Sequence, residues 1–201
     1  MGEKEKLSCR QSRGSKNSKQ IQMKVWHFTP WANNKRLGNA YNDYMSLIPD
    51  GDSACLRDLD TCFLTPDAGA IIQHEAKQNP LSVLVCYTNR IHPMAKAQLA
   101  PPALFDNTNI VKHIDYAELC KSFPGNQTDE VAGPLSGFFM VVPKAIWRIV
   151  RFKEGLGLLG VDTLFFRDLR TAGIEIRRIN SLYIFHIYRM KKGIDDKTHL
   201  L

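Results

Sequence analysis

The sequence predicts a single α/β domain in which helices flank a mostly parallel central sheet. Short apolar runs alternate with segments of helical periodicity, and this alternation is typical of sheets built from parallel strands. The chain has 201 residues, of which 44% are hydrophobic, so it is long enough to bury one sizeable core. It shows no internal repeat and no domain linker after residue 22.

Six segments have the composition of strands that are buried on one or both faces. The predicted strands are 23–28, 54–59, 82–87, 137–142, 174–179 and 182–188. The second of them ends in acidic residues. Since open α/β sheets bind ligands beyond the carboxyl ends of their strands, functional residues are expected just after these segments.

Four segments between the strands have apolar residues at helical spacing. Thr65, Pro66 and Asp67 have the order of a helix start, with a cap, a proline in the first helical position and a first-turn acid. Gly173 follows the most regular pattern and predicts its C-terminal cap. The predicted helices are 38–48, a segment that begins at 65, 143–152 and 161–172.

The stretch 88–135 has only weak patterning and contains five prolines. A long irregular stretch inside a compact domain is commonly a functional loop or a lid. We therefore expect this stretch to cover a binding site, where a lid would exclude water from the bound ligand.

The net charge of +7 is concentrated in residues 1–22, which carry six basic and two acidic side chains. Because this segment is too polar to build a core, it is expected to be a disordered, solvated tail ahead of a domain at 23–201. A basic tail can contact nucleic acid or anionic lipid. The remainder of the chain lacks a stripe of basic and aromatic residues, so nucleic acid is not expected as a partner.

Cysteine usage and hydropathy favour a cytoplasmic protein. The five cysteines include no C-x-x-C pair, which indicates free thiols rather than a disulfide framework or a zinc site. No apolar run approaches the roughly 20 residues that span a bilayer, and the N-terminus lacks an apolar signal region. A peripheral position on the inner face of a membrane is compatible with the same features.

Asp58, Leu59 and Asp60 follow an apolar strand and are the most informative local motif. Residues i and i+2 of an extended chain point the same way, so both carboxylates are expected to face one side. Two adjacent carboxylates repel unless a cation joins them, and hard ions such as Mg²⁺ or Mn²⁺ prefer oxygen ligands. A solvated turn is the alternative interpretation of the same residues.

The window 38–66 resembles family 2 glycosyltransferases of the GT-A fold, which carry a glycine, an Ala-x-Asn helix start and a strand ending in D-x-D. The counterparts here are Gly38, Ala40, Asn42, Asp58 and Asp60. The stretch 155–173 is similar to the family's segment in which an acid opens a helix, and its acid is Asp162. The closing stretch 183–189 resembles the histidine-bearing end of small phage and bacterial relatives. Only 23–37 precede the first match, which implies a shortened nucleotide-binding half.

The resemblance implies a metal-dependent glycosyltransferase that moves a sugar from a nucleotide diphosphate to an acceptor, with inversion at the anomeric centre. It implies Mn²⁺ or Mg²⁺ as cofactor and a glycan, a lipid-linked sugar or a protein as acceptor. Two other functions remain open. One is a nucleotidyltransferase, which the single glycine in 27–38 disfavours. The other is a non-catalytic module that binds carbohydrate or nucleic acid.

Individual roles also follow from the resemblance. Asp58 and Asp60 would hold the metal, with His186 as a further ligand, and Asp162 would deprotonate the acceptor. In the alternative interpretation, His186 is a core histidine in a strand, and Asp162 is a favourable charge at a helix N-terminus. Donor contacts are expected from Thr29, Pro30, Asn42, Arg57, Leu59, Ser136 and Gly137. Phosphate or acceptor contacts are expected from Asn89, Arg90 and Arg189.

Overall fold

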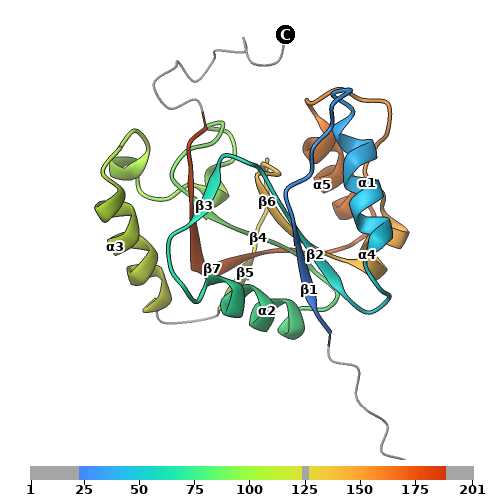
Figure 1. The fold of residues 1–201 in the computed structure, drawn as a ribbon. Helices are drawn as coiled ribbons and strands as arrows, with labels where there is room; N and C mark the ends of the chain where they lie inside the picture. Colours follow the sequence, from blue (N-terminus) through green and yellow to red (C-terminus); the bar gives the residue numbers. More distant parts are fainter. Residues whose placement is uncertain (1–22, 124–126, 189–201) are drawn as a thin grey trace, which may run out of the picture.

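The computed structural model describes residues 23–123 and 127–188, and Figure 1 shows one central sheet surrounded by helices. The predicted tail at 1–22 and the predicted contact residue Arg189 lie outside the described residues. Within the described part of the chain, no helix is both long and apolar enough to cross a membrane.

The sheet has the strand order β1-β2-β6-β4-β7-β3, and β5 is a further partner of β7. Its strands are β1 (Val25–Phe28), β2 (Ser53–Arg57), β3 (Thr61–Phe63), β4 (Val83–Thr88), β5 (Thr128–Glu130), β6 (Phe139–Pro143) and β7 (Ile176–His186). β1 is parallel to β2 and β4 is parallel to β7, whereas β6 is antiparallel to β2 and β4. β3 and β5 are also antiparallel to β7.

The prediction of a mostly parallel sheet is therefore wrong, because the sheet is mixed. The apolar pattern indicates where a strand lies, but its direction depends on which distant strand it pairs with. The predicted strands 174–179 and 182–188 are one long strand, β7, whose register against β4 shifts between Cys86 and Tyr87. β3 has only three residues and was not predicted.

Helices cover both faces of the sheet. One face packs against α1 (Leu37–Leu47), α4 (Lys144–Ile149) and α5 (Val161–Thr171), and the other packs against α2 (Ala68–Gln78). Alternate residues of β2 face opposite sides of the sheet. Ala54 and Leu56 pack in the core beneath α1, α4 and α5, whereas Cys55 packs in the core beneath α2. The central run of β2 is therefore apolar on both faces, as its sequence indicates.

The stretch 88–135 is more regular than its sequence predicts. It contains α3 (Ile110–Lys121), two short helices η1 (Lys96–Gln98) and η2 (Pro102–Leu104), and β5. The buried side chains of α3 are His113, Ala117 and Cys120, whereas several of its aliphatic residues are exposed. A buried face made of such residues produces little helical periodicity in hydrophobicity, which is why the helix was missed.

Helix ends agree with the predictions in part. α2 begins at Ala68 with Asp67 in the N-cap position, so the predicted cap at Thr65 lies too early. Gly173 follows α5 with a φ of 71°, as expected for a residue that ends a helix in the left-handed region.

α1 packs tightly against the segment that follows α4. A Cβ on Gly38 would collide with the carbonyl oxygen of Lys153, so the helix can approach only because this residue is glycine. One turn later, the Asn42 side chain donates to the Phe152 carbonyl at 2.9 Å and accepts from the Trp147 indole at 2.9 Å. Asn42 therefore anchors this segment to α1, and its predicted contact with a donor remains a prediction.

Replacing Gly38 with alanine should destabilise the protein by about 1–3 kcal/mol or more, because the new methyl group overpacks a rigid backbone contact. The matched control is Gly69→Ala in α2, where a Cβ would meet nothing within 4 Å. That control should stabilise the helix by up to about 1 kcal/mol. Denaturant titrations of both variants measure their free energies of unfolding. Equal changes in free energy for the two substitutions would contradict this expectation.

Candidate active site

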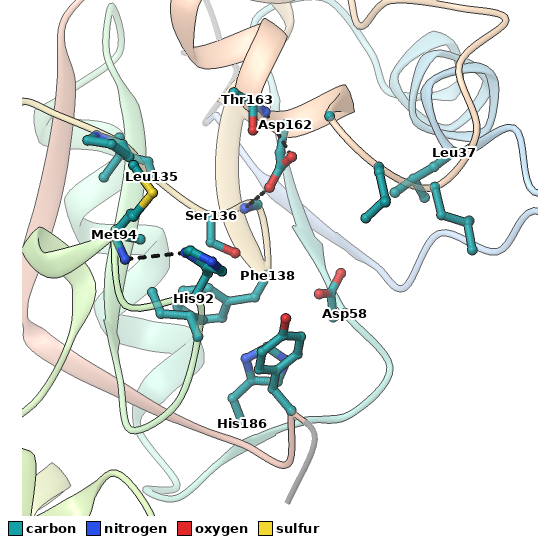
Figure 2. Close-up of a pocket in the computed structure, with 18 of the residues that line it drawn as sticks. Leu37, Asp58, His92, Met94, Leu135, Ser136, Phe138, Asp162, Thr163 and His186 are labelled. Atoms are coloured by element: carbon teal, nitrogen blue, oxygen red, sulfur yellow. Dashed lines mark hydrogen bonds between the residues drawn. The ribbon is translucent and has the colours of Figure 1, made fainter. Parts of the chain in front are cut away.

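A cavity of about 620 Å³ lies where β2 and β7 end and where α1 and α5 begin. Its walls come from the end of β2, the end of β7, the loop before β6, the start of α5 and the segment that follows β4. Figure 2 shows Asp58 and His186 on one side of this space and Asp162 on another. The cavity therefore brings together residues that are far apart in the sequence.

The acidic pair lies in a tight turn between β2 and β3. The backbone N–H and the hydroxyl of Thr61 donate to the Asp58 carbonyl at 3.3 and 2.7 Å. The expectation of an extended chain at these residues is therefore wrong, and the turn, rather than the two-residue repeat of a strand, orients the carboxylates.

The turn also places the acidic pair beside a histidine. β3 pairs with the end of β7, and this register sets Thr61 opposite His186. One ligand atom each of Asp58, Asp60 and His186 lies within 4.8 Å of the others, although Asp60 and His186 are 126 positions apart. The predicted metal-binding residues are thus brought together.

His186 is almost fully buried and lies between aromatic rings. Its ring stacks on Phe138 at a centroid distance of 5.3 Å and contacts Tyr188 at 5.4 Å. Nε2 lies 3.2 Å from the Asp60 carboxylate, and Nδ1 has no hydrogen-bond partner among the described residues. An unpaired buried nitrogen is energetically costly, so this histidine is not a fully satisfied core residue.

The electrostatics of the cluster disfavour an ionised carboxylate at Asp58. Burial is the main cause that raises the pKa of Asp58 to about 7; His186 opposes this rise, whereas Asp60 and Asp162 add to it. A divalent ion would favour the ionised carboxylates and would remove the repulsion between them. Two carboxylates and one imidazole form a donor set that fits Mn²⁺ or Mg²⁺.

Asp162 lies in the first turn of α5 and lines the cavity. Its Oδ2 accepts from the Gly137 N–H and its Oδ1 from the Thr163 N–H, both at 2.8 Å (Figure 2). A Cβ on Gly137 would lie 2.6 Å from the Cβ of Asp162, so the glycine permits this close approach. Asp162 is thus a helix N-terminal acid, as one interpretation expects, and it also lines the cavity, whereas its role as a base remains a prediction.

The other predicted contact residues divide into two groups. Ser136 and Gly137 line the cavity. The described residues that line it do not include the remaining predicted donor contacts, namely Thr29, Pro30, Asn42, Arg57 and Leu59. Arg57 donates to the Thr61 carbonyl at 3.0 Å and stacks on Phe63 instead. Leu59 is exposed to solvent.

Asn89 and Arg90 are buried beside the cavity rather than inside it. Both polar groups of the Asn89 amide bond to the backbone of His186. Arg90 stacks on the Phe105 ring at 4.9 Å and forms an ion pair with Asp106. A direct contact of either residue with phosphate or acceptor remains a prediction.

Several residues in or beside the cavity carried no functional signal in the sequence. Tyr41 and His92 line the cavity, and Gln98 hydrogen-bonds the backbone of Ser136. A polar residue in an irregular stretch is ordinary until its burial is known, and Gln98 has no exposed surface. The described lining residues include neither lysine nor arginine.

A search against protein-family models finds no family that matches this chain, and a search of curated proteins finds no match either.

Replacing Asp58 with asparagine should stabilise the metal-free protein more at pH 8 than at pH 4. Because the pKa of Asp58 is raised in the folded state, its protonation contributes fully to stability at pH values below the ordinary pKa of 3.8. This contribution to stability is lost as the pH rises through about 7. Asparagine cannot ionise, so the melting temperature of Asp58→Asn relative to wild type should increase over this range.

Melting curves in the presence of a chelator test this expectation. Asp115→Asn, at an exposed position of α3, is the control and should show no such trend. A pH-independent difference between Asp58→Asn and wild type would contradict the burial of a carboxylate at this position.

Proposed function

We propose that this protein is a metal-dependent glycosyltransferase of the GT-A type, which transfers a sugar from a nucleotide diphosphate to an acceptor hydroxyl. One observation carries the proposal: Asp58, Asp60 and His186 converge at the edge of a cavity that Asp162 also faces. The cavity volume of about 620 Å³ is within the range of small-molecule sites. The resemblance of the sequence to family 2 enzymes supports the same assignment.

The residues that would hold Mn²⁺ or Mg²⁺ are Asp58, Asp60 and His186. When bound, such an ion supplies positive charge that binds the diphosphate and stabilises the negative charge that develops as it leaves. Because the described lining residues include no lysine or arginine, the described part of the cavity offers no cationic side chain for this role. We expect donor binding to depend on the metal.

Asp162 is the proposed general base. The acceptor oxygen forms a bond to the anomeric carbon, the bond from that carbon to the diphosphate oxygen breaks, and the acceptor proton moves to Asp162. The N–H groups of Gly137 and Thr163 hold the carboxylate in place, while each oxygen retains a second lone pair. A single displacement of this kind inverts the anomeric centre.

The wall opposite the α5 N-terminus would limit access of water to the donor. Ile91, Met94 and Leu135 line the cavity and come from the stretch that the sequence predicts as a cover. Excluding water strengthens the electrostatic interactions within a site and protects a reactive donor from hydrolysis. The acceptor, whether a glycan, a lipid-linked sugar or a protein, would enter on the side of Asp162.

Mn²⁺ together with UDP or GDP should raise the melting temperature, because a ligand that binds only the folded state stabilises it. The rise should disappear with chelator and in Asp58→Ala and Asp60→Ala, while the exposed Asp115→Ala control should retain it. Thermal-shift assays with each nucleotide make the measurement. A shift that is unchanged in both aspartate variants would exclude the metal assignment.

Replacing Asp162 with asparagine should lower kcat by about 10²–10⁴-fold, the usual contribution of a positioned general base. The metal-dependent nucleotide shift should remain, because the metal-binding residues are unchanged. Turnover of UDP- and GDP-sugars with Mn²⁺ is the assay, and Asp168→Asn in the same helix is the control that should retain activity. Full activity of Asp162→Asn would rule out its role as the base.

A further inference from the structure

Two buried side-chain amides lie at either end of the segment that follows β4. Asn89 and Gln98 have no exposed surface. Each side chain accepts a hydrogen bond from the N–H of one cavity residue and donates a hydrogen bond to the C=O of that same residue. Buried amides need such partners, but these partners belong to the site itself.

Asn89 hydrogen-bonds the backbone of His186. Its Oδ1 accepts from the His186 N–H at 2.8 Å, and its Nδ2 donates to the His186 carbonyl at 3.2 Å. β4 ends at Thr88, which pairs with Ile184, so β4 offers no backbone partner at His186. The Asn89 side chain replaces that partner and thereby fixes the end of β7.

Gln98 acts on the opposite wall of the cavity. Its Oε1 accepts from the Ser136 N–H at 2.7 Å, and its Nε2 donates to the Ser136 carbonyl at 3.0 Å. That carbonyl belongs to the same peptide group as the Gly137 N–H, which donates to Asp162. Gln98 thus sets the plane of the peptide that holds the carboxylate, and the linked hydrogen bonds polarise one another.

We propose that Asn89 and Gln98 are positioning residues with separate targets. Asn89 places the metal ligand His186, and Gln98 places the general base Asp162 through the Ser136–Gly137 peptide. Neither residue lines the cavity, so each acts through a neighbour (Figure 2 shows Ser136, Asp162 and His186). The roles of the two targets rest on the proposed function.

The chain contains a matched control for these contacts. Gln73 accepts from the Val25 N–H at 3.0 Å and donates to the Met23 carbonyl at 3.0 Å. This partly buried side chain also bonds one backbone N–H and one backbone C=O, but those of Val25 in β1 and of Met23, which precedes the strand. Gln73→Leu reports what the loss of such an amide does to the fold alone.

The first measurement is Mn²⁺ affinity by calorimetry on the full chain, with the metal as the sole ligand. Asn89→Leu should weaken binding by about 10–100-fold, as is usual when a group that orients a metal ligand is lost. Gln98→Leu and Gln73→Leu should bind Mn²⁺ as wild type does. If Asn89→Leu does not fold, Asn89→Ala is used in the same titration.

The second measurement is hydrogen exchange of the Gly137 amide, followed by NMR with ¹⁵N-glycine labelling. Gln98→Leu should accelerate this exchange by about tenfold or more, because the peptide loses the contacts that restrict local opening. In Asn89→Leu and Gln73→Leu, the exchange rate of the Gly137 amide should change no more than the change in global stability of each variant accounts for.

Each outcome has a distinct meaning. Wild-type affinity in Asn89→Leu would overturn the role of Asn89 and leave the proposed function in place. Absence of Mn²⁺ binding in the wild type would overturn the metal assignment and the role of Asn89 together. Unchanged Gly137 exchange in Gln98→Leu would overturn the role of Gln98, whatever the metal measurement shows.

Discussion

The pairing of β3 with the end of β7 is the constraint on which the candidate site depends. This short antiparallel contact sets Thr61 opposite His186, and the Ile187 N–H donates to the Asp60 carbonyl at 2.9 Å. The acidic turn is therefore fixed against the last strand. The histidine is more than a hundred positions from the two carboxylates in the sequence, so no local interaction brings them together. The pairing of β3 with β7 does so.

Close backbone packing organises the other half of the site. Gly137 allows Asp162 to approach the loop before β6, and Gly38 allows α1 to approach the segment before α5. Each contact places the first turn of a helix, α5 or α1, at the cavity. Burial, together with the nearby acids, then raises the pKa of Asp58, so the arrangement that forms the cavity also disfavours the ionised carboxylate.

Particular residues show how far the sequence could predict this structure. The strand-forming runs, the helix ended by Gly173 and the proximity of Asp58 to His186 were predictable, because apolar periodicity, glycine geometry and a family-like motif are local signals. The direction of β6 and the existence of β3 were not predictable, because they depend on pairing between distant segments. The same limit applies to Gln98, since its burial is a tertiary property.

The sequence by itself determined an α/β domain, most of its helices and strands, and the chemical character of its acidic motif. Tertiary structure alone decided the mixed sheet, the pairing of β3 with β7 and the buried amides that contact the backbone around the cavity. The physical reason is that propensity and periodicity act over a few residues. Pairing register, burial and the resulting electrostatics arise only when segments that are distant in the sequence come into contact.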